Sequence, residues 1–82
     1  MDFPKLHSGQ YAVLTAEVQT GIILNSECKS WWRKDGAAVP WHVFDSLAAA
    51  REFAIAEVAR NPLIEINIYD NLKQWIQVIR SQ

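Results

Sequence analysis

Residues 63–69 alternate strictly between apolar and more polar side chains. Because successive side chains of a β-strand point to opposite faces of a sheet, this pattern predicts a strand with one face made of isoleucine. The residues of that face are Ile64, Ile66 and Ile68. The opposite face carries Glu65, Asn67 and Tyr69. The isoleucine face needs an apolar layer against it, and the rest of the chain has to supply that layer.

Residues 47–60 predict the covering layer, because almost all of them are good helix formers. Asp45 or Ser46 can cap the first turn, and Asn61-Pro62 stops the helix. The side of the helix turned away from the sheet carries alanines and few charged groups, so it is smooth and weakly polar. We expect the N-terminal segment or another subunit to pack against that flank.

Four further segments have strand character. Residues 11–18 alternate, and Gly21 separates them from a β-branched run at 22–24, either as a bulge in one long strand or as the turn of a hairpin. Residues 28–33 can run extended into a turn at 34–36, and residues 74–80 return from a turn at 70–73. On the last of these strands the alternation places Ile76 and Val78 toward the helix.

These elements predict a small single domain of the α+β class over residues 1–82. We expect an antiparallel sheet of about four strands with one α-helix on one face, in the order β-β-α-β-β. Residues 1–10 are expected to be disordered or loosely packed. A chain of 82 residues buries little more than half of its surface, so it has little apolar area to spare.

The composition of the chain limits the cellular compartments and the classes of partner that we expect. Eight basic and nine acidic residues give a net charge of −1, too small to steer the chain toward nucleic acid or an anionic membrane. No stretch is long and apolar enough for a transmembrane helix, and the first residues do not resemble a secretory signal. The single cysteine, Cys28, cannot form an internal disulfide. We therefore expect a cytoplasmic protein.

The sequence gives little support for catalysis or a cofactor. His7, Cys28 and His42 match no compact zinc spacing, and the isolated glycines form no phosphate-binding loop. Cys28 and His42 can in principle meet as a nucleophile and a base, but a small buried cysteine is the commoner situation. We predict no enzyme activity, no cofactor, no catalytic residues and no metal site.

The face opposite the helix is the most informative surface. One helix cannot cover both faces of the sheet, and the second face is expected to carry Tyr69, Trp75 and Ile79 among polar residues. Aromatic side chains with few charges are typical of protein interfaces and ligand grooves. The alternative is that the loop at 39–44, which includes Trp41, folds back over this face.

Residues 31–41 hold three of the four tryptophans beside basic side chains. Stacking rings with cations suit single-stranded nucleic acid, but strand alternation places Trp31 and Trp32 on opposite faces and nearby acids dilute the charge. Nucleic-acid binding is therefore not expected. The residues considered for an interaction surface are Trp31, Trp32, Arg33, Trp41, Tyr69, Trp75 and Ile79.

Two functions remain open. The first is a small protein-interaction or regulatory domain that binds a protein partner or forms a homodimer, through the aromatic sheet face or the smooth helix flank. The second is a binder of a small ligand or peptide, with Trp31 or Trp32, Trp41, Tyr69 and Trp75 lining a groove and Arg33 or Lys29 fixing an anionic group.

Overall fold

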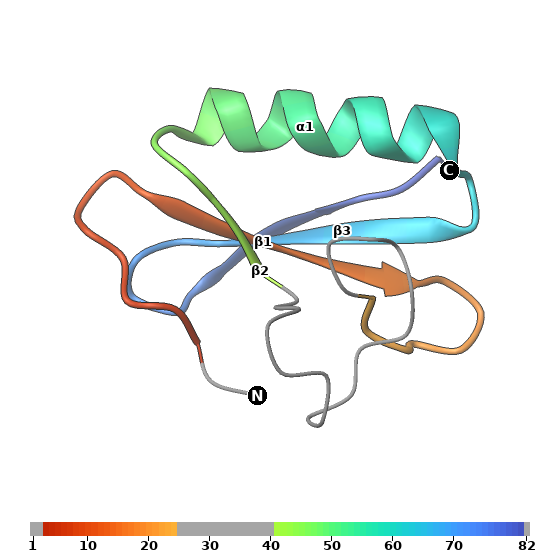
Figure 1. Cartoon of the computed structure of the whole chain (residues 1–82), viewed down its shortest axis with the longest axis horizontal. Coiled ribbons are helices and arrows are strands. Elements are labelled where there is room, and N and C mark those ends of the chain that lie inside the picture. Colours follow the sequence, from red (N-terminus) through yellow and green to blue (C-terminus); the bar gives the residue numbers. More distant parts are fainter. Residues whose placement is uncertain (1–2, 25–40, 82) are drawn as a thin grey trace.

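The computed structural model describes residues 3–24 and 41–81 of the chain. In this part a four-stranded antiparallel sheet is covered on one face by a single helix (Figure 1). The strands stand in the order β2-β1-β3-β4. The elements in chain order are β1 Tyr11–Glu17, β2 Trp41–Phe44, α1 Leu47–Arg60, β3 Ile64–Tyr69 and β4 Trp75–Ile79. The α+β prediction and the order β-β-α-β-β are confirmed.

Gly21 reverses the chain after β1. Its φ of +73° lies in the left-handed region, which glycine adopts without steric cost. Its amide donates to the Glu17 carbonyl at 2.8 Å, and the Glu17 amide donates to the Ile22 carbonyl at 2.9 Å. Ile23 then bridges back to Ala16. Of the two alternatives for Gly21, the hairpin turn is the one observed.

The alternative that residues 39–44 form a loop over the second face was wrong about the loop, although the ring of Trp41 does lie on that face against Tyr69. Residues 41–44 form β2, which pairs antiparallel with β1 from Leu14↔Trp41 to Tyr11↔Phe44. Three of its four residues are aromatic or β-branched, and pairing satisfies backbone groups along the edge of β1. The strand predicted at 28–33 and the turn at 34–36 lie outside the described residues.

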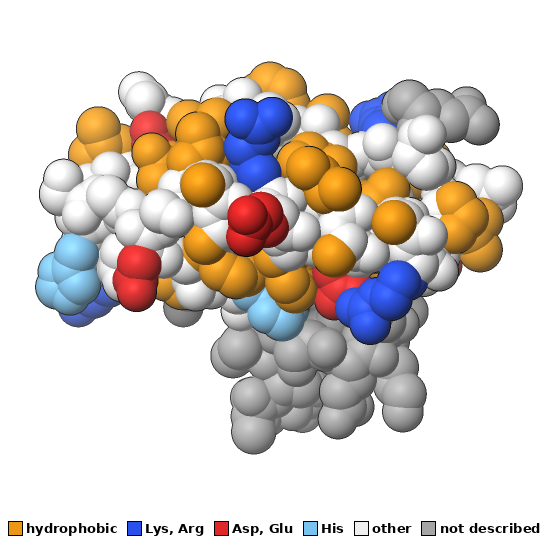
Figure 2. All heavy atoms as spheres, turned by 90° about the horizontal axis from the view of Figure 1, so that it is seen from above, with side chains coloured by type: hydrophobic (Ala, Val, Ile, Leu, Met, Phe, Trp, Pro, Cys, Tyr) orange, Lys and Arg blue, Asp and Glu red, His pale blue; other side chains and the backbone are white. Residues whose placement is uncertain are grey.

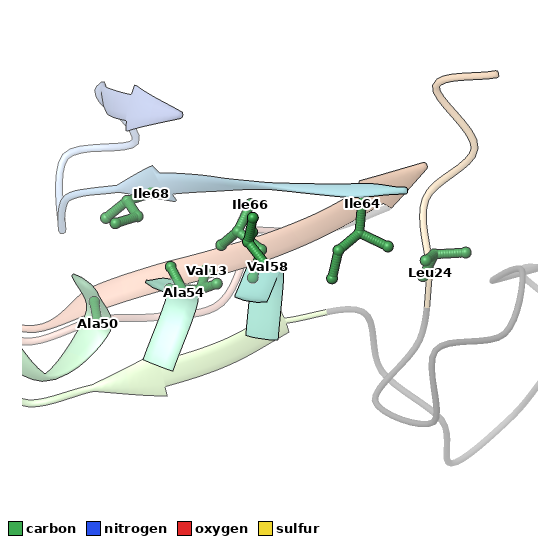
Figure 3. Packing of buried hydrophobic residues seen from close by; sticks show 8 residues of the cluster. All are labelled: Val13, Leu24, Ala50, Ala54, Val58, Ile64, Ile66 and Ile68. Carbon is green, nitrogen blue, oxygen red and sulfur yellow. The ribbon is translucent and has the colours of Figure 1, made fainter. Parts of the chain in front are cut away.

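The core lies between β3 and α1. Ile64, Ile66 and Ile68 are buried, with no more than 2% of each side chain exposed, as their alternation predicts. Figure 3 shows them facing the helix, with Leu24 beyond the Ile64 end. The helix residues opposite are Ala50, Ala54 and Val58. These small side chains leave room for the isoleucines to fill the space between the two layers.

Both candidate capping residues of α1 are used, but in different ways. Ser46 is the N-cap, since its Oγ accepts the amide hydrogen of Ala49 at 3.1 Å. Asp45 Oδ1 accepts a hydrogen bond from the side chain of Gln10 at 3.0 Å, which connects the start of the helix to the residue before β1. Asn61 ends the helix by donating its amide to the Glu57 carbonyl.

The orientation predicted for β4 was partly wrong because the strand contains a bulge. Tyr69 pairs with Trp75, but Ile68 pairs with Gln77, so Ile76 is an extra residue on β4. One extra residue shifts the alternation of everything that follows it. Ile79 therefore packs against the core cluster on the helix side, and Val78 lies opposite Asn67 on the second face.

We expect Ile66→Ala to lower the free energy of unfolding by about 2–5 kcal/mol, because Ile66 is completely buried and the change leaves a cavity. Urea denaturation followed by circular dichroism measures the effect. Leu72→Ala is the matched control, since Leu72 is 69% exposed and should change stability by no more than about 0.5 kcal/mol. Equal effects of the two changes would contradict the assignment of this core.

Candidate interaction surface along the outer strand

The described residues contain no cluster of three histidine, cysteine or acidic side chains that could hold a metal ion. No helix in this part of the chain is long and apolar enough to cross a membrane. His42 faces the helix, where its ring packs against Phe53 with centroids 4.9 Å apart. Its neighbour on the same side of β2, Phe44, contacts Phe53 at 5.1 Å. His42 is therefore a packed residue in this structure.

Three rings form a cluster on the second face of the sheet. Trp41 and Tyr69 meet edge to face with centroids 5.7 Å apart. Phe3 joins them at 5.0 Å from Trp41 and 6.1 Å from Tyr69, again edge to face. These are favourable aromatic geometries. The N-terminal segment thus packs on the second face of the sheet through Phe3, and not on the helix flank.

The β1 part of the second face is also closed. Ala12, Leu14 and Ala16 point away from the helix, because they alternate with Val13, and none of them is more than 7% exposed. Two of the three are alanines, which leave little apolar area to cover. This half of the second face therefore offers no bare aromatic platform among the described residues.

Three exposed apolar side chains lie in β4 or in the turn before it, and others lie on β2, on α1 and where β1 ends and β3 begins. Trp75 is 55% exposed, although its Nε1 donates to Asn67 Oδ1 at 3.1 Å, which holds the indole against the second face. Ile76, the bulge residue, is 37% exposed. In the turn before β4, Leu72 is 69% exposed. Lys73 beside it has a φ of +64°, and Asp70 Oδ1 accepts the amides of Leu72 and Gln74. We call Trp75–Ile79, with its outer backbone edge, the β4 edge.

The structure divides the predicted interaction residues into four groups. Trp41 and Tyr69 come together in the ring cluster with Phe3. Trp75 pairs with Tyr69 across the strands but is largely open to solvent. Ile79 lies on the helix side of the sheet. Trp31, Trp32 and Arg33 lie outside the described residues.

Two grooves lie at the end of the sheet near the C-terminus, and neither is lined by aromatic side chains. The first has a volume of about 430 Å³ between the end of β1 and the start of β3, and its lining residues are Val18, Gln19, Pro62, Leu63, Arg80 and Ser81. The second has a volume of about 320 Å³ between α1 and β4, and its lining residues are Ile55, Val58, Ala59, Ile79, Arg80 and Ser81.

Sequence reasoning missed the second groove. It predicted a smooth helix flank but placed Ile79 on the opposite face, so it did not bring the helix and the outer strand together at one surface. Ile55 is 55% exposed at this groove. Figure 2 looks onto the helix side, where many hydrophobic side chains are interspersed with acidic and basic ones. The predicted smoothness of the flank agrees with this view.

Charge along this end of the sheet is sparse and partly paired. Arg80, just after β4, donates to Glu65 Oε2 at 2.7 Å. Arg60 pairs with Glu57 one helical turn earlier. Between Lys73 and Arg80 the chain carries no charged residue and no proline. The β4 edge is therefore an apolar and neutral strand.

Comparison of the chain with models of protein families, with curated proteins and with solved structures gives no match.

We expect Phe3→Ala to lower the free energy of unfolding by about 1–3 kcal/mol, because it removes two edge-to-face ring contacts and the area that they bury. Urea denaturation gives the stability, and the ring-proton shifts of Tyr69 report the loss of the cluster. Phe3→Leu is the control that keeps apolar bulk without a ring, and it should have an intermediate effect. Unchanged stability and unchanged Tyr69 shifts would show that Phe3 does not pack on this face.

Proposed function

We propose that this protein is a non-enzymatic protein-interaction domain that binds its partner along the β4 edge. The observation that carries the proposal is that β4 is an outer strand, neutral over its whole length, with Trp75 and Ile76 exposed. Of the aromatic sheet face predicted from the sequence, only the part at β4, where Trp75 lies, belongs to the proposed binding surface. The proposal keeps the class of function expected from the sequence and moves the contact surface from the middle of a face to its edge.

An outer strand offers a backbone surface as well as side chains. Among the described residues, β4 pairs with β3 on one side and with no strand on the other. Unpaired amide and carbonyl groups along such an edge can accept one more strand, which is a common mode of protein and peptide recognition. Main-chain hydrogen bonds then supply affinity, while the side chains on alternate faces supply specificity.

The β4 edge also lacks most of the features that prevent unwanted pairing. Natural edge strands are commonly guarded by charged residues, by proline or by bulges. The bulge affects only the beginning of β4, at Ile76. From Gln77 to Ile79 the strand pairs regularly with β3. Exposed Trp75 fits an interface, because tryptophan is enriched among the residues that dominate binding energy.

The second hypothesis, a small-ligand or peptide groove lined by aromatic side chains, stays a prediction. Both grooves near the C-terminus are lined by aliphatic and polar side chains, and Phe3 packs beside Trp41 and Tyr69. No observation in this part of the chain favours that function over binding along the edge.

The test compares the complexes formed by the wild type and by Ile76→Lys. Light scattering over a range of concentrations detects self-association, and affinity capture from the source cells followed by mass spectrometry detects foreign partners. A lysine on an outer strand opposes strand pairing, so the complex, whichever it is, should weaken by at least roughly tenfold.

Val43→Lys is the matched control, since Val43 is a β-branched residue of the other outer strand and is 45% exposed, against 37% for Ile76. It should leave the complex intact. Equal weakening by both substitutions, or a complex that Ile76→Lys does not affect, would contradict the proposal. So would the absence of any complex for the wild type at millimolar concentration.

A further inference from the structure

We infer that the occupant of the β4 edge is a second copy of this chain, paired antiparallel through β4 about a twofold axis that passes next to Val78. This inference rests on the proposed function and names its partner. It joins the two four-stranded sheets into one continuous sheet with both helices on the same face. Twofold dimers of this kind use the same patch on both subunits, so the patch has to complement itself.

The pattern of faces along β4 is compatible with pairing to a second copy of itself. Opposite residues of an antiparallel pair have side chains on the same face. Val78 lies on the second face, while Gln77, opposite Ile68, and Ile79 lie on the helix side. Pairing Val78 with Val78 of the second copy places Gln77 opposite Ile79, and the faces match.

The bulge conflicts with a register about Gln77. If Gln77 lay at the axis, Ile79 on the helix side would face Trp75 of the second copy, which lies on the second face beside Asn67. Those side chains cannot share a face in a continuous sheet. The bulge therefore disfavours a register about Gln77, whereas in the register about Val78 the corresponding mismatch, Trp75 opposite Ser81, falls beyond the end of β4.

The charges beside β4 do not oppose pairing of two copies. In this register Arg80 lies opposite Ile76 of the second copy, and Lys73 lies beyond the paired residues. No like charges come face to face, and the guanidinium of Arg80 stays beside Glu65 at 2.7 Å. The net charge of −1 gives little long-range repulsion between two copies.

The groove between α1 and β4 also lies next to the proposed axis. Ile55, Val58 and Ala59 of α1 line it together with Ile79 of β4, and Ile79 is one residue from the axis. Because the axis is perpendicular to the sheet, it brings this groove of one copy next to the same groove of the other. The exposed Ile55 side chains of both copies can then fill the space between the two helices. The apolar core would thereby continue across the dimer interface.

The inference is tested by cross-linking in a Cys28→Ser background. Val78→Cys should form an intermolecular disulfide with oxidised glutathione, because directly opposite Cα atoms are about 4.5–5.5 Å apart, within disulfide range. Gln77→Cys is the control, since its copies are offset by two positions and lie about 8 Å apart, beyond that range.

A second measurement on the unmodified chain guards against misfolding of the cysteine variants. Mixed samples of isotope-labelled and unlabelled protein should give intermolecular nuclear Overhauser effects between Ile79 and Gln77. Ile76→Lys should raise the dimer dissociation constant by at least roughly tenfold, and Val43→Lys should leave it unchanged.

A monomer at millimolar concentration would overturn the inference. If that monomer still binds a foreign protein and loses it on Ile76→Lys, the proposed function stands and only the second copy is wrong. A dimer that cross-links through Gln77→Cys but not Val78→Cys would overturn the register. A dimer insensitive to Ile76→Lys would contradict both the inference and the proposed function.

Discussion

The packing of the β3 isoleucines on the small residues of α1 is the contact on which the rest of this structure depends. Ile66 and Ile68 have no exposed surface, and the helix meets them with Ala50 and Ala54, which are also completely buried. A single helix covers only one face of the sheet. The second face and the two outer strands therefore have to be covered by other parts of the chain or by a partner, or stay exposed. The next question is how the side chains outside this core are distributed over the uncovered face and edges.

The chain closes the second face unevenly. Around β1 the side chains of this face are buried, and around Trp41 and Tyr69 the ring of Phe3 from the N-terminal segment packs on it. Toward β4 no comparable cover occurs among the described residues, and Trp75 and Ile76 stay exposed. A small domain has too few residues to close every surface, so the place left open is informative about function.

The sequence predicted those elements whose periodicity is local and uninterrupted. The alternation in β3 and the pattern of helix formers in α1 each show which side chains are buried, without information from the rest of the chain. β2 was missed because four residues after a proline resemble a loop, and its strand character depends on the free edge of β1. The side chains of β4 were partly assigned to the wrong faces, because a bulge is a pairing defect that alternation within one strand does not reveal. The groove between Ile55 and Ile79 was hidden for the same reason.

We propose that the outer edge of β4 is open in the single chain and paired in the complex. Native-state amide hydrogen exchange measured by NMR at low micromolar and at millimolar concentration tests it most directly, because protection reports pairing residue by residue. We expect the β4 amides directed away from β3 to exchange at least roughly tenfold more slowly in the concentrated sample. Amides of β3, paired on both sides, should keep the same protection relative to global unfolding. Protection that rises with concentration on another surface and not on β4 would contradict the account.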